Sequence, residues 1–238
     1  MNDMMVRLGH LVAPKLLRGI HGSNLAMALK VRHLFEVLRI ETVIDVGANQ
    51  GQFHKFLRQR VNFKGQIESF EPLPELVEKL QTEARNDDKW RIHPCALGAE
   101  PGEMTINVMT QTELSSFRRP ISIDDEKFDR VNTITRSLPV AVETLDRVFA
   151  GSAGLGRTYL KLDTQGFDLE VVKGGPQTIG YIPALQTEVS IRPLYAEMPD
   201  YREAIARFES LGFAIADLFL VSSDEAHRAI EFDCIMIR

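Results

Sequence analysis

Short apolar runs recur along the chain and alternate with stretches whose apolar residues fall on one helical face. Such runs, bounded by turn residues, are typical of buried parallel strands. The first five lie at residues 43–46, 66–70, 90–96, 159–162 and 184–190. Helical periodicity follows the turn after the first run and recurs at residues 74–84 and 201–211. Strands that alternate with helices predict an α/β fold with a mostly parallel sheet.

The carboxyl-terminal part of the pattern departs from this alternation. Runs at residues 213–220 and 232–237 are separated by about a dozen residues without helical periodicity, which favours an antiparallel pair. Residues 102–109 alternate in polarity and predict a further strand at the edge of the same sheet. Residues 140–146 predict a short strand that leads into a helix.

One segment, residues 110–138, is polar and poorly periodic. A long irregular segment inside a compact domain is typically functional, so we interpret it as a lid on the substrate side. A disordered insertion is the alternative. Within this segment, Ser115 and Ser116 are our candidates for contact with a substrate.

The first apolar run leads directly into a glycine-containing turn at residues 47–51 and then into a helical pattern. Strand, glycine turn and helix form a nucleotide site in α/β proteins, because the backbone can approach the ligand and the helix start offers free N–H groups. A dinucleotide turn requires glycine where this chain has Asn49 and Gln52. The spacing instead fits the acid-x-Gly-x-Gly-x-Gly pattern of enzymes that bind S-adenosylmethionine. An ordinary tight turn is the alternative.

In that interpretation the turn holds the methionine part of the donor. The turn residues assigned to it are Gly47, Ala48, Asn49 and Gly51. Asn49 replaces the middle glycine, and asparagine tolerates left-handed backbone better than most residues. Asp45 lies inside the end of the strand, where a carboxylate is costly to bury without a partner. We expect it to orient the ammonium group of the donor, directly or through water.

A second acid lies where the next strand ends. Glu71 follows Asp45 by 26 residues, near the ~20 expected for an acid that binds ribose hydroxyls. An ionised carboxylate accepts two hydrogen bonds and suits a vicinal diol. Pro72 ends the strand and restricts the loop. At the end of the third strand, Ala96 and Leu97 can line an adenine slot, with a plain strand-to-turn exit as the alternative.

A third acid, Asp163, follows the run 159–162 at the carboxyl end of a strand that would neighbour the first. It is our first candidate for orienting or deprotonating a substrate hydroxyl and also for contact with the donor, and Glu188 is the second candidate for the catalytic role. A structural cap on the following helix is the alternative for Asp163. Gln165 is a further candidate for substrate contact. A divalent metal on the two acids would ease ionisation, but the ligand set is incomplete and we predict no metal.

Composition narrows the class of protein. The length of 238 residues fits one domain, which we place at 41–238, with an N-terminal helical extension at 1–40. A net charge of −5 argues against a nucleic-acid partner. Cys95 and Cys234 lie in apolar runs, which suits small buried residues in a reducing cytoplasm.

No apolar run approaches the ~20 residues of a membrane helix, so we expect no transmembrane segment. We expect the amphipathic N-terminal helix to pack on the sheet edge or over the active site. Its basic residues leave peripheral contact with an anionic membrane as the alternative. The pattern does not specify the oligomeric state, and a homodimer is one option.

As a set, these motifs resemble the FkbM family of S-adenosylmethionine-dependent methyltransferases over about residues 42–238. The carrying segments are 43–51, 70–72, 95–98, 144–146, 160–166, 186–188 and 231–233. The resemblance implies a class I methyltransferase fold, which is a Rossmann-like three-layer sandwich. Its seven-stranded sheet has the order 3-2-1-4-5-7-6, with strand 7 antiparallel.

The resemblance also implies a function. It predicts S-adenosylmethionine as the methyl donor and O-methylation of a hydroxyl on a sugar, glycolipid or secondary metabolite. Two alternatives stay open: an NAD(P)-dependent oxidoreductase, which the failed glycine spacing disfavours, and a non-catalytic nucleotide-binding protein on the same fold.

Overall fold

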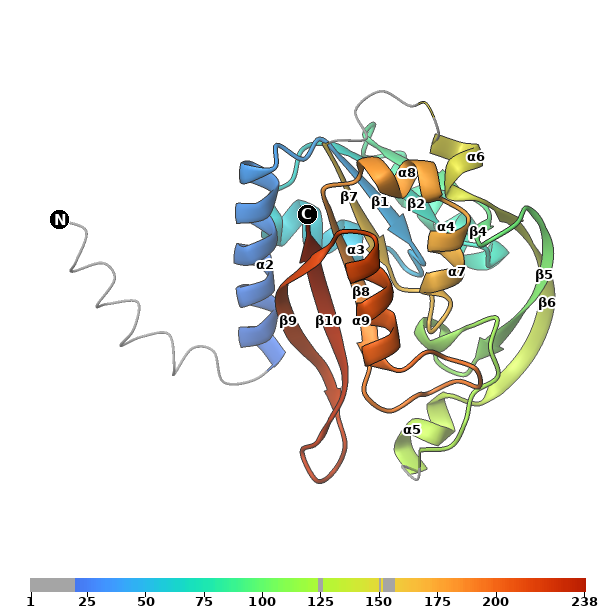
Figure 1. Ribbon diagram of the computed structural model, residues 1–238. Helices are drawn as coiled ribbons and strands as arrows, with labels where there is room; N and C mark the ends of the chain where they lie inside the picture. Colours follow the sequence, from blue (N-terminus) through green and yellow to red (C-terminus); the bar gives the residue numbers. More distant parts are fainter. Residues whose placement is uncertain (1–19, 124–125, 150, 152–156) are drawn as a thin grey trace.

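The computed structural model describes residues 20–123, 126–149, 151 and 157–238. In this part of the chain a seven-stranded sheet lies between two layers of helices (Figure 1). The predicted three-layer α/β architecture is therefore confirmed. The predictions for residues 1–19 fall outside the described residues.

The main sheet has the strand order β3-β2-β1-β7-β8-β10-β9. Its strands are β1 (Thr42–Val46), β2 (Gln66–Phe70), β3 (Trp90–His93), β7 (Thr158–Leu162), β8 (Ala184–Ser190), β9 (Ala214–Ser223) and β10 (Ala229–Ile237). β10 runs antiparallel to both of its neighbours, and the other pairings are parallel. Numbered within the sheet, this is the predicted order 3-2-1-4-5-7-6, with strand 7 antiparallel.

The order of the strands reverses between β1 and β7. In such sheets the ligand crevice lies outside the carboxyl ends of the strands at this switch point. Val46, the last residue of β1, is in register with Phe70 on β2 and with Leu162 on β7. The three strands therefore end at one level, and the residues that follow them come together there.

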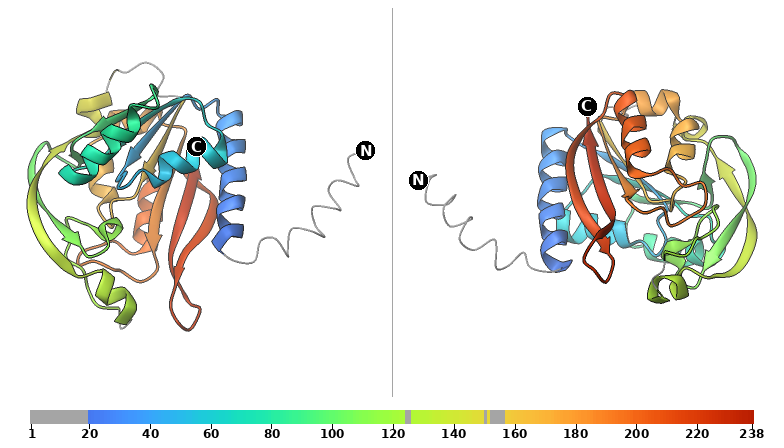
Figure 2. Two further views of the ribbon diagram at one scale, coloured as in Figure 1. Left: turned by 180° about the vertical axis from the view of Figure 1, so that it is seen from behind. Right: turned by 60° about the horizontal axis from the view of Figure 1, so that its bottom comes forward.

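Helices cover both faces of the sheet, as the two views of Figure 2 show. One face carries α2 (Ile20–Val37), α3 (Gln52–Phe56), the π-helical turn η1 (Leu57–Val61) and α4 (Pro74–Ala84). The other carries α6 (Leu145–Phe149), α7 (Asp168–Lys173), α8 (Pro176–Tyr181) and α9 (Tyr201–Ser210). A separate apolar cluster fills the space between the sheet and each helical layer.

The helix α2 packs on the sheet, as its apolar spacing predicts. Val31, Leu34 and Phe35 recur at helical intervals and are buried. The ring of Phe35 lies edge-on to those of Phe63 and Tyr159, with both centroid distances at 5.0 Å. Burial of each large apolar side chain contributes about 2 kcal/mol, so α2 is part of the domain core.

A second, three-stranded sheet corrects the prediction for residues 102–109. Its order is β4-β6-β5, with β4 (Ala96–Leu97), β5 (Gly102–Met109) and β6 (Ile134–Glu143). β5 therefore pairs with β6 and not with the edge of the main sheet. The strand predicted at 140–146 does lead into a helix, but it is longer than expected, because β6 begins at Ile134 and ends at Glu143. β5 and β6 leave most of their side chains exposed to solvent, so they lack the apolar run that marks a buried strand.

The prediction of one strand at 90–96 is wrong as well. β3 ends at His93, and Ala96 pairs with Val142 of β6 in the second sheet. Pro94 lies at this break, and its lack of an N–H group explains why the ladder stops there.

The segment predicted as an irregular lid, 110–138, has regular structure in its described part. It contains the 3-10 turn η2 (Thr112–Leu114), the helix α5 (Glu126–Val131) and the start of β6. Bridges from Ser116 to Asn107 and from Pro120 to Tyr195 attach its first half to the domain. This half reaches the carboxyl end of the main sheet, where the candidate site lies.

Candidate active site

The turn after β1 has a backbone that requires glycine. Gly47 has a φ of 85° and Gly51 a φ of 78°, and Asn49 between them has a φ of 45°. A β-carbon at Gly47 would lie 2.1 Å from the backbone oxygen of Asp163. The turn after β1 and the end of β7 are therefore in direct backbone contact, which only glycine permits.

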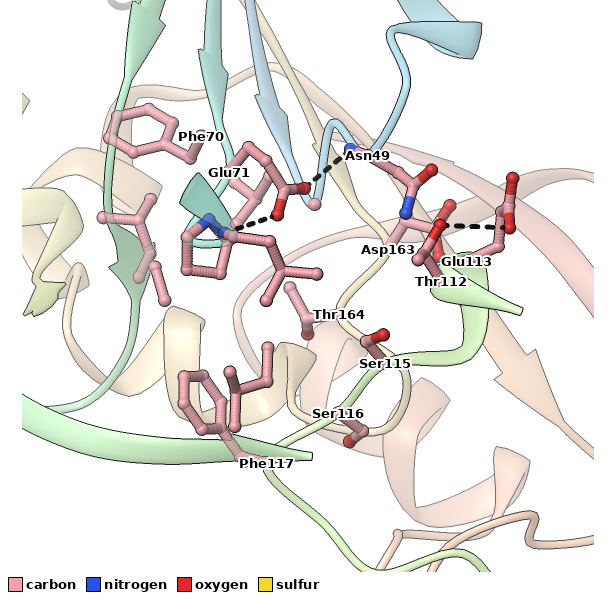
Figure 3. Close-up of a pocket in the computed structure, with 17 residues that line it drawn as sticks. Asn49, Phe70, Glu71, Thr112, Glu113, Ser115, Ser116, Phe117, Asp163 and Thr164 are labelled. Atoms are coloured by element: carbon pink, nitrogen blue, oxygen red, sulfur yellow. Dashed lines mark hydrogen bonds between the residues drawn. The ribbon is translucent and has the colours of Figure 1, made fainter. Parts of the chain in front are cut away.

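A narrow cavity opens beside this turn (Figure 3). Glu71 lies in its wall and holds the turn, because its Oε2 accepts a hydrogen bond of 2.8 Å from the Asn49 backbone N–H. Its Oε1 accepts one of 2.9 Å from the Leu73 backbone N–H. Burial raises the pKa of Glu71 to about 7, although these two hydrogen bonds oppose the change. Each oxygen keeps a second lone pair for a ligand.

The remaining walls of the narrow cavity are mainly apolar. They are formed by Val46, Phe70, Pro72, Leu73, Ala96, Leu97, Ile106 and Phe117. Ser115, Ser116 and Phe117 lie on the side opposite Phe70 and Glu71 (Figure 3). Two further acids, Glu113 and Asp163, also line this cavity. A mainly apolar slot with a carboxylate in its wall matches a flat base attached to a diol.

A wider cavity of about 340 Å³ lies on the other side of the turn. The two cavities share Gly47, Asn49, Glu113 and Asp163. The wide cavity is more polar, and its further lining residues are Met27, Ala48, Gln52, Phe53, Phe56, Lys161, Gln186, Glu188, Val221 and Asp233. Two spaces of different polarity therefore meet at the carboxyl ends of β1 and β7.

A buried ion pair supports the floor of the wide cavity. Asp45 is fully buried, and its Oδ2 accepts a hydrogen bond of 3.1 Å from the Ser69 hydroxyl. Lys161 Nζ lies 3.4 Å from Asp45 Oδ1 and donates a hydrogen bond of 3.0 Å to Asp163 Oδ2. Burial alone would lower the pKa of Lys161, but the two carboxylates outweigh it and raise the pKa. The lysine therefore stays charged.

The second network joins the two acids nearest the wide cavity. Gln165 Nε2 donates hydrogen bonds of 3.0 Å to Asp163 Oδ1 and 2.8 Å to Glu188 Oε2. Burial raises the pKa of Glu188 well above its usual value, and the nearby carboxylates of Glu231 and Asp163 raise it further. Glu188 is therefore a stronger base than a solvated glutamate.

Comparison with known proteins identifies this arrangement. Residues 45–215 match the family model described as the methyltransferase FkbM domain. The chain belongs to the FkbM methyltransferase family. Among curated proteins, none matches the sequence.

Solved structures show the same fold as this FkbM protein. A methyltransferase FkbM from Methylobacillus flagellatus aligns with a TM-score of 0.55 at 18% identity, over 84% of this chain and 44% of that one. This chain thus spans less than half the length of that relative. A magnesium protoporphyrin IX methyltransferase from Synechocystis, solved with bound S-adenosylmethionine, aligns with a TM-score of 0.49 at 11% identity, over 99% and 96% of the two chains.

Most of the site residues expected from the sequence line one or both cavities of the FkbM domain. The exceptions are Asp45, Gly51 and Gln165. Asp45 lies beneath the turn, paired with Lys161, and Gly51 packs against Leu80 and Trp90. Gln165 lies behind the two acids that it joins. These three residues support the site from outside the cavities.

Two further side chains expected to contact a substrate, those of Ser115 and Ser116, form hydrogen bonds within the protein. The Ser116 hydroxyl donates a hydrogen bond of 2.7 Å to the Gln165 backbone oxygen, and the Ser115 hydroxyl accepts one of 3.3 Å from the Met109 N–H. Asp163 does not cap the helix that follows it, because the N-cap of α7 is Phe167. The alternative of a structural cap therefore does not describe Asp163.

Sequence reasoning missed several residues of the site. Lys161, inside the apolar run of β7, could have indicated the buried ion pair, because a buried cation requires a buried acid. Tyr195, Gln186 and Asp233 carried no such signal, since their contacts depend on how distant strands and loops pair. The described residues include no group of three or more His, Cys, Asp or Glu placed to hold a metal.

Proposed function

We propose that this FkbM methyltransferase transfers the methyl group of S-adenosylmethionine to a hydroxyl oxygen of a sugar, a glycolipid or a secondary metabolite. The observation that carries the proposal is the pair of cavities that meet at the glycine turn. One is narrow and mainly apolar, with Glu71 as the acid that it does not share, and the other is wide and more polar.

The narrow cavity suits the adenosine part of the donor. Adenine packs against Pro72, Ala96 and Leu97, and the ribose hydroxyls donate hydrogen bonds to Glu71. The methionine part lies over the turn that contains Gly47, Ala48, Asn49 and Gly51, next to Asp163. This places the sulfonium at the junction of the two cavities.

The wide cavity suits a hydroxylated acceptor. Its aromatic wall is formed by Phe53 and Phe56, whose stacked rings have centroids 5.7 Å apart. Such rings pack on the apolar faces of sugars, while carboxylates and amides bind the hydroxyl groups. Asp163 and Glu188 line the same cavity and are the candidate proton acceptors.

The reaction is an in-line displacement. The acceptor oxygen attacks the methyl carbon, the bond between carbon and sulfur breaks, and S-adenosylhomocysteine leaves as a neutral thioether. The hydroxyl proton passes to a carboxylate of the protein. Because an alkyl hydroxyl is a weak acid, the proton leaves late, as the methyl group transfers. The main contribution of the protein is to align the oxygen with the methyl group.

Two measurements test this function. Calorimetry with S-adenosylhomocysteine and with NADH separates a methyltransferase from a nicotinamide enzyme. Transfer of a radiolabelled methyl group into glycoside and glycolipid extracts then tests the acceptor class. Binding of S-adenosylhomocysteine without transfer to any hydroxylated acceptor would support the non-catalytic alternative. Label in an amine or carbon acceptor would contradict O-methylation.

The proposed setting is the cytoplasm, with no nucleic-acid partner. The thiols of Cys95 and Cys234 are free, as a reducing compartment favours. None of the described helices combines the length and hydrophobicity of a membrane span. Peripheral contact with a membrane and assembly as a homodimer both stay open to experiment.

A further inference from the structure

Gln165 has a backbone conformation that its surroundings enforce. Its φ is 52°, in the left-handed region that residues other than glycine rarely adopt. It is only 7% exposed, and its backbone oxygen accepts the hydrogen bond from Ser116. Strained residues of this kind persist only where several contacts hold them, and they gather at functional sites.

The side chain of Gln165 joins the two acids of the wide cavity. A primary amide has two N–H donors, and those of Gln165 reach Asp163 and Glu188, one each. Its Oε1 lies 3.0 Å from the Tyr195 hydroxyl, which also contacts the Leu114 backbone oxygen at 2.7 Å. The hydroxyl has a single hydrogen for these two oxygens. The two carboxylates, which only accept, therefore orient the amide nitrogen toward themselves, and Oε1 faces Tyr195.

This arrangement gives Asp163 and Glu188 different numbers of occupied carboxylate oxygens. Gln165 occupies one oxygen of Asp163 and Lys161 occupies the other. In Glu188, Gln165 occupies Oε2, and Oε1 accepts no hydrogen bond from the described residues. Asp163 lies at the junction of both cavities, whereas Glu188 lines only the wide one of these two.

We propose that Gln165 is a positioning residue, which holds Asp163 and Glu188 together and leaves Glu188 Oε1 as the proton acceptor for the substrate hydroxyl. Asp163 then faces the donor. This reverses the order in which the sequence ranked the two acids, and it rests on the proposed methyl transfer to a hydroxyl.

The charged groups around Glu188 allow the role of Gln165 to be measured as a change in the pKa of Glu188. Glu188 is surrounded by carboxylates from three elements, and these are Asp163 after β7, Asp168 at the start of α7, and Glu231 and Asp233 on β10. The Gln165 amide is the hydrogen-bond donor to Glu188 among the described residues. Since a donor favours the ionised carboxylate, loss of this amide raises the pKa of Glu188.

The first test needs no acceptor. Carboxyl groups of glutamate are labelled with carbon-13, the Glu188 signal is assigned with Glu188→Gln, and its titration is compared in the wild type and in Gln165→Leu. We expect the midpoint of Glu188 to rise by about one to two pH units, the effect of one hydrogen bond to a charged group. A midpoint that moves by less than about 0.3 units overturns the proposal.

Two more variants keep the test decisive. Gln165→Gly removes the amide and favours the left-handed backbone, so it replaces Gln165→Leu if that variant does not fold. Tyr195→Phe retains Gln165 and removes the hydroxyl beside its Oε1, while the two carboxylates still orient the amide, so we expect a smaller rise of the same sign. Gln81→Leu, at an exposed position on α4, is the matched control and leaves the midpoint unchanged.

Calorimetry with S-adenosylhomocysteine separates this inference from the proposed function. Gln165 lines neither cavity, so this measurement reports on the donor site separately from the titration of Glu188. If the wild type itself does not bind S-adenosylhomocysteine, the proposed function fails whatever the titration shows. If it binds and the titration does not move, only the positioning role of Gln165 is contradicted.

Discussion

The turns after β1 and β7 lie against each other but present different groups to the cavities. Both follow a buried parallel strand, and both contain non-glycine residues with positive φ, Asn49 in the first and Gln165 in the second. The first turn presents backbone and keeps its acid, Asp45, beneath the surface. The second presents side chains, because Asp163 lies in the cavity wall and Gln165 holds it there.

In the proposed function, this difference separates donor binding from the chemical step. A donor that every turnover shares can be bound by backbone N–H groups, whose positions depend on glycine spacing. An acceptor and its proton require side chains with adjusted pKa values, and these depend on a network. Variants of the first turn should therefore affect folding and donor binding, and variants of the second should affect the chemical step.

The largest effect on activity is expected at Glu188, which accepts a hydrogen bond from Gln165 of the second turn. Glu188→Gln should lower the rate of labelled methyl transfer by about 10²- to 10⁴-fold, because the base is lost. Affinity for S-adenosylhomocysteine should stay within about twofold, since only the acceptor side changes. Glu209→Gln, on the exposed side of α9, is the control. A Glu188→Gln variant with more than about half of the normal rate would show that another group takes the proton.

The next effect is on stability at the first turn. In Gly47→Ala the new methyl group would collide with the Asp163 backbone and the φ of 85° would be strained. We expect at least about 3 kcal/mol loss in the free energy of unfolding, measured in urea. Gly212→Ala has a similar φ of 90° but nothing within 4 Å, so it isolates the strain. Equal losses of unfolding free energy in both variants would mean that the close contact of Gly47 with the Asp163 backbone adds nothing to the effect of the strained φ.

The pH dependence of donor binding tests Glu71. Its pKa of about 7 lies above the usual 4.5, so the free carboxyl gains a proton as the pH falls below 7. Ribose hydroxyls bind best to the ionised form, and affinity for S-adenosylhomocysteine should then fall about tenfold per pH unit below 7. Calorimetry of Glu71→Gln should give weak binding without this slope, whereas Glu75→Gln should retain it. A wild-type affinity that is flat between pH 5.5 and about 8 would contradict the assignment.

The smallest effect is expected at Asn49. Its backbone N–H, not its side chain, binds Glu71, and its φ of 45° suits glycine. Asn49→Gly should therefore change affinity for S-adenosylhomocysteine less than about twofold and stability by less than about 1 kcal/mol. A tenfold loss of affinity in calorimetry would instead indicate that the asparagine side chain contacts the donor.

The sequence determined the main sheet and the first turn. Apolar runs and glycine spacing are local properties, and they were sufficient to place most strands of this sheet, the first turn, and Glu71 and Asp163 at strand ends. The strand order and the reversal between β1 and β7 followed from the resemblance to the FkbM family. The second sheet escaped prediction because its strands are largely exposed and one of them, β4, has only two residues. Exposed and short strands lack the periodicity that identifies buried ones.

Only the tertiary structure decided which partners each acid has. The contacts of Gln165 with Tyr195 and Ser116 join residues 30 and 49 positions apart. The pairing of Lys161 with Asp45 joins adjacent strands in the same way. A sequence shows which polar residues are present, but their pKa values and hydrogen bonds depend on burial and on neighbours that folding brings together.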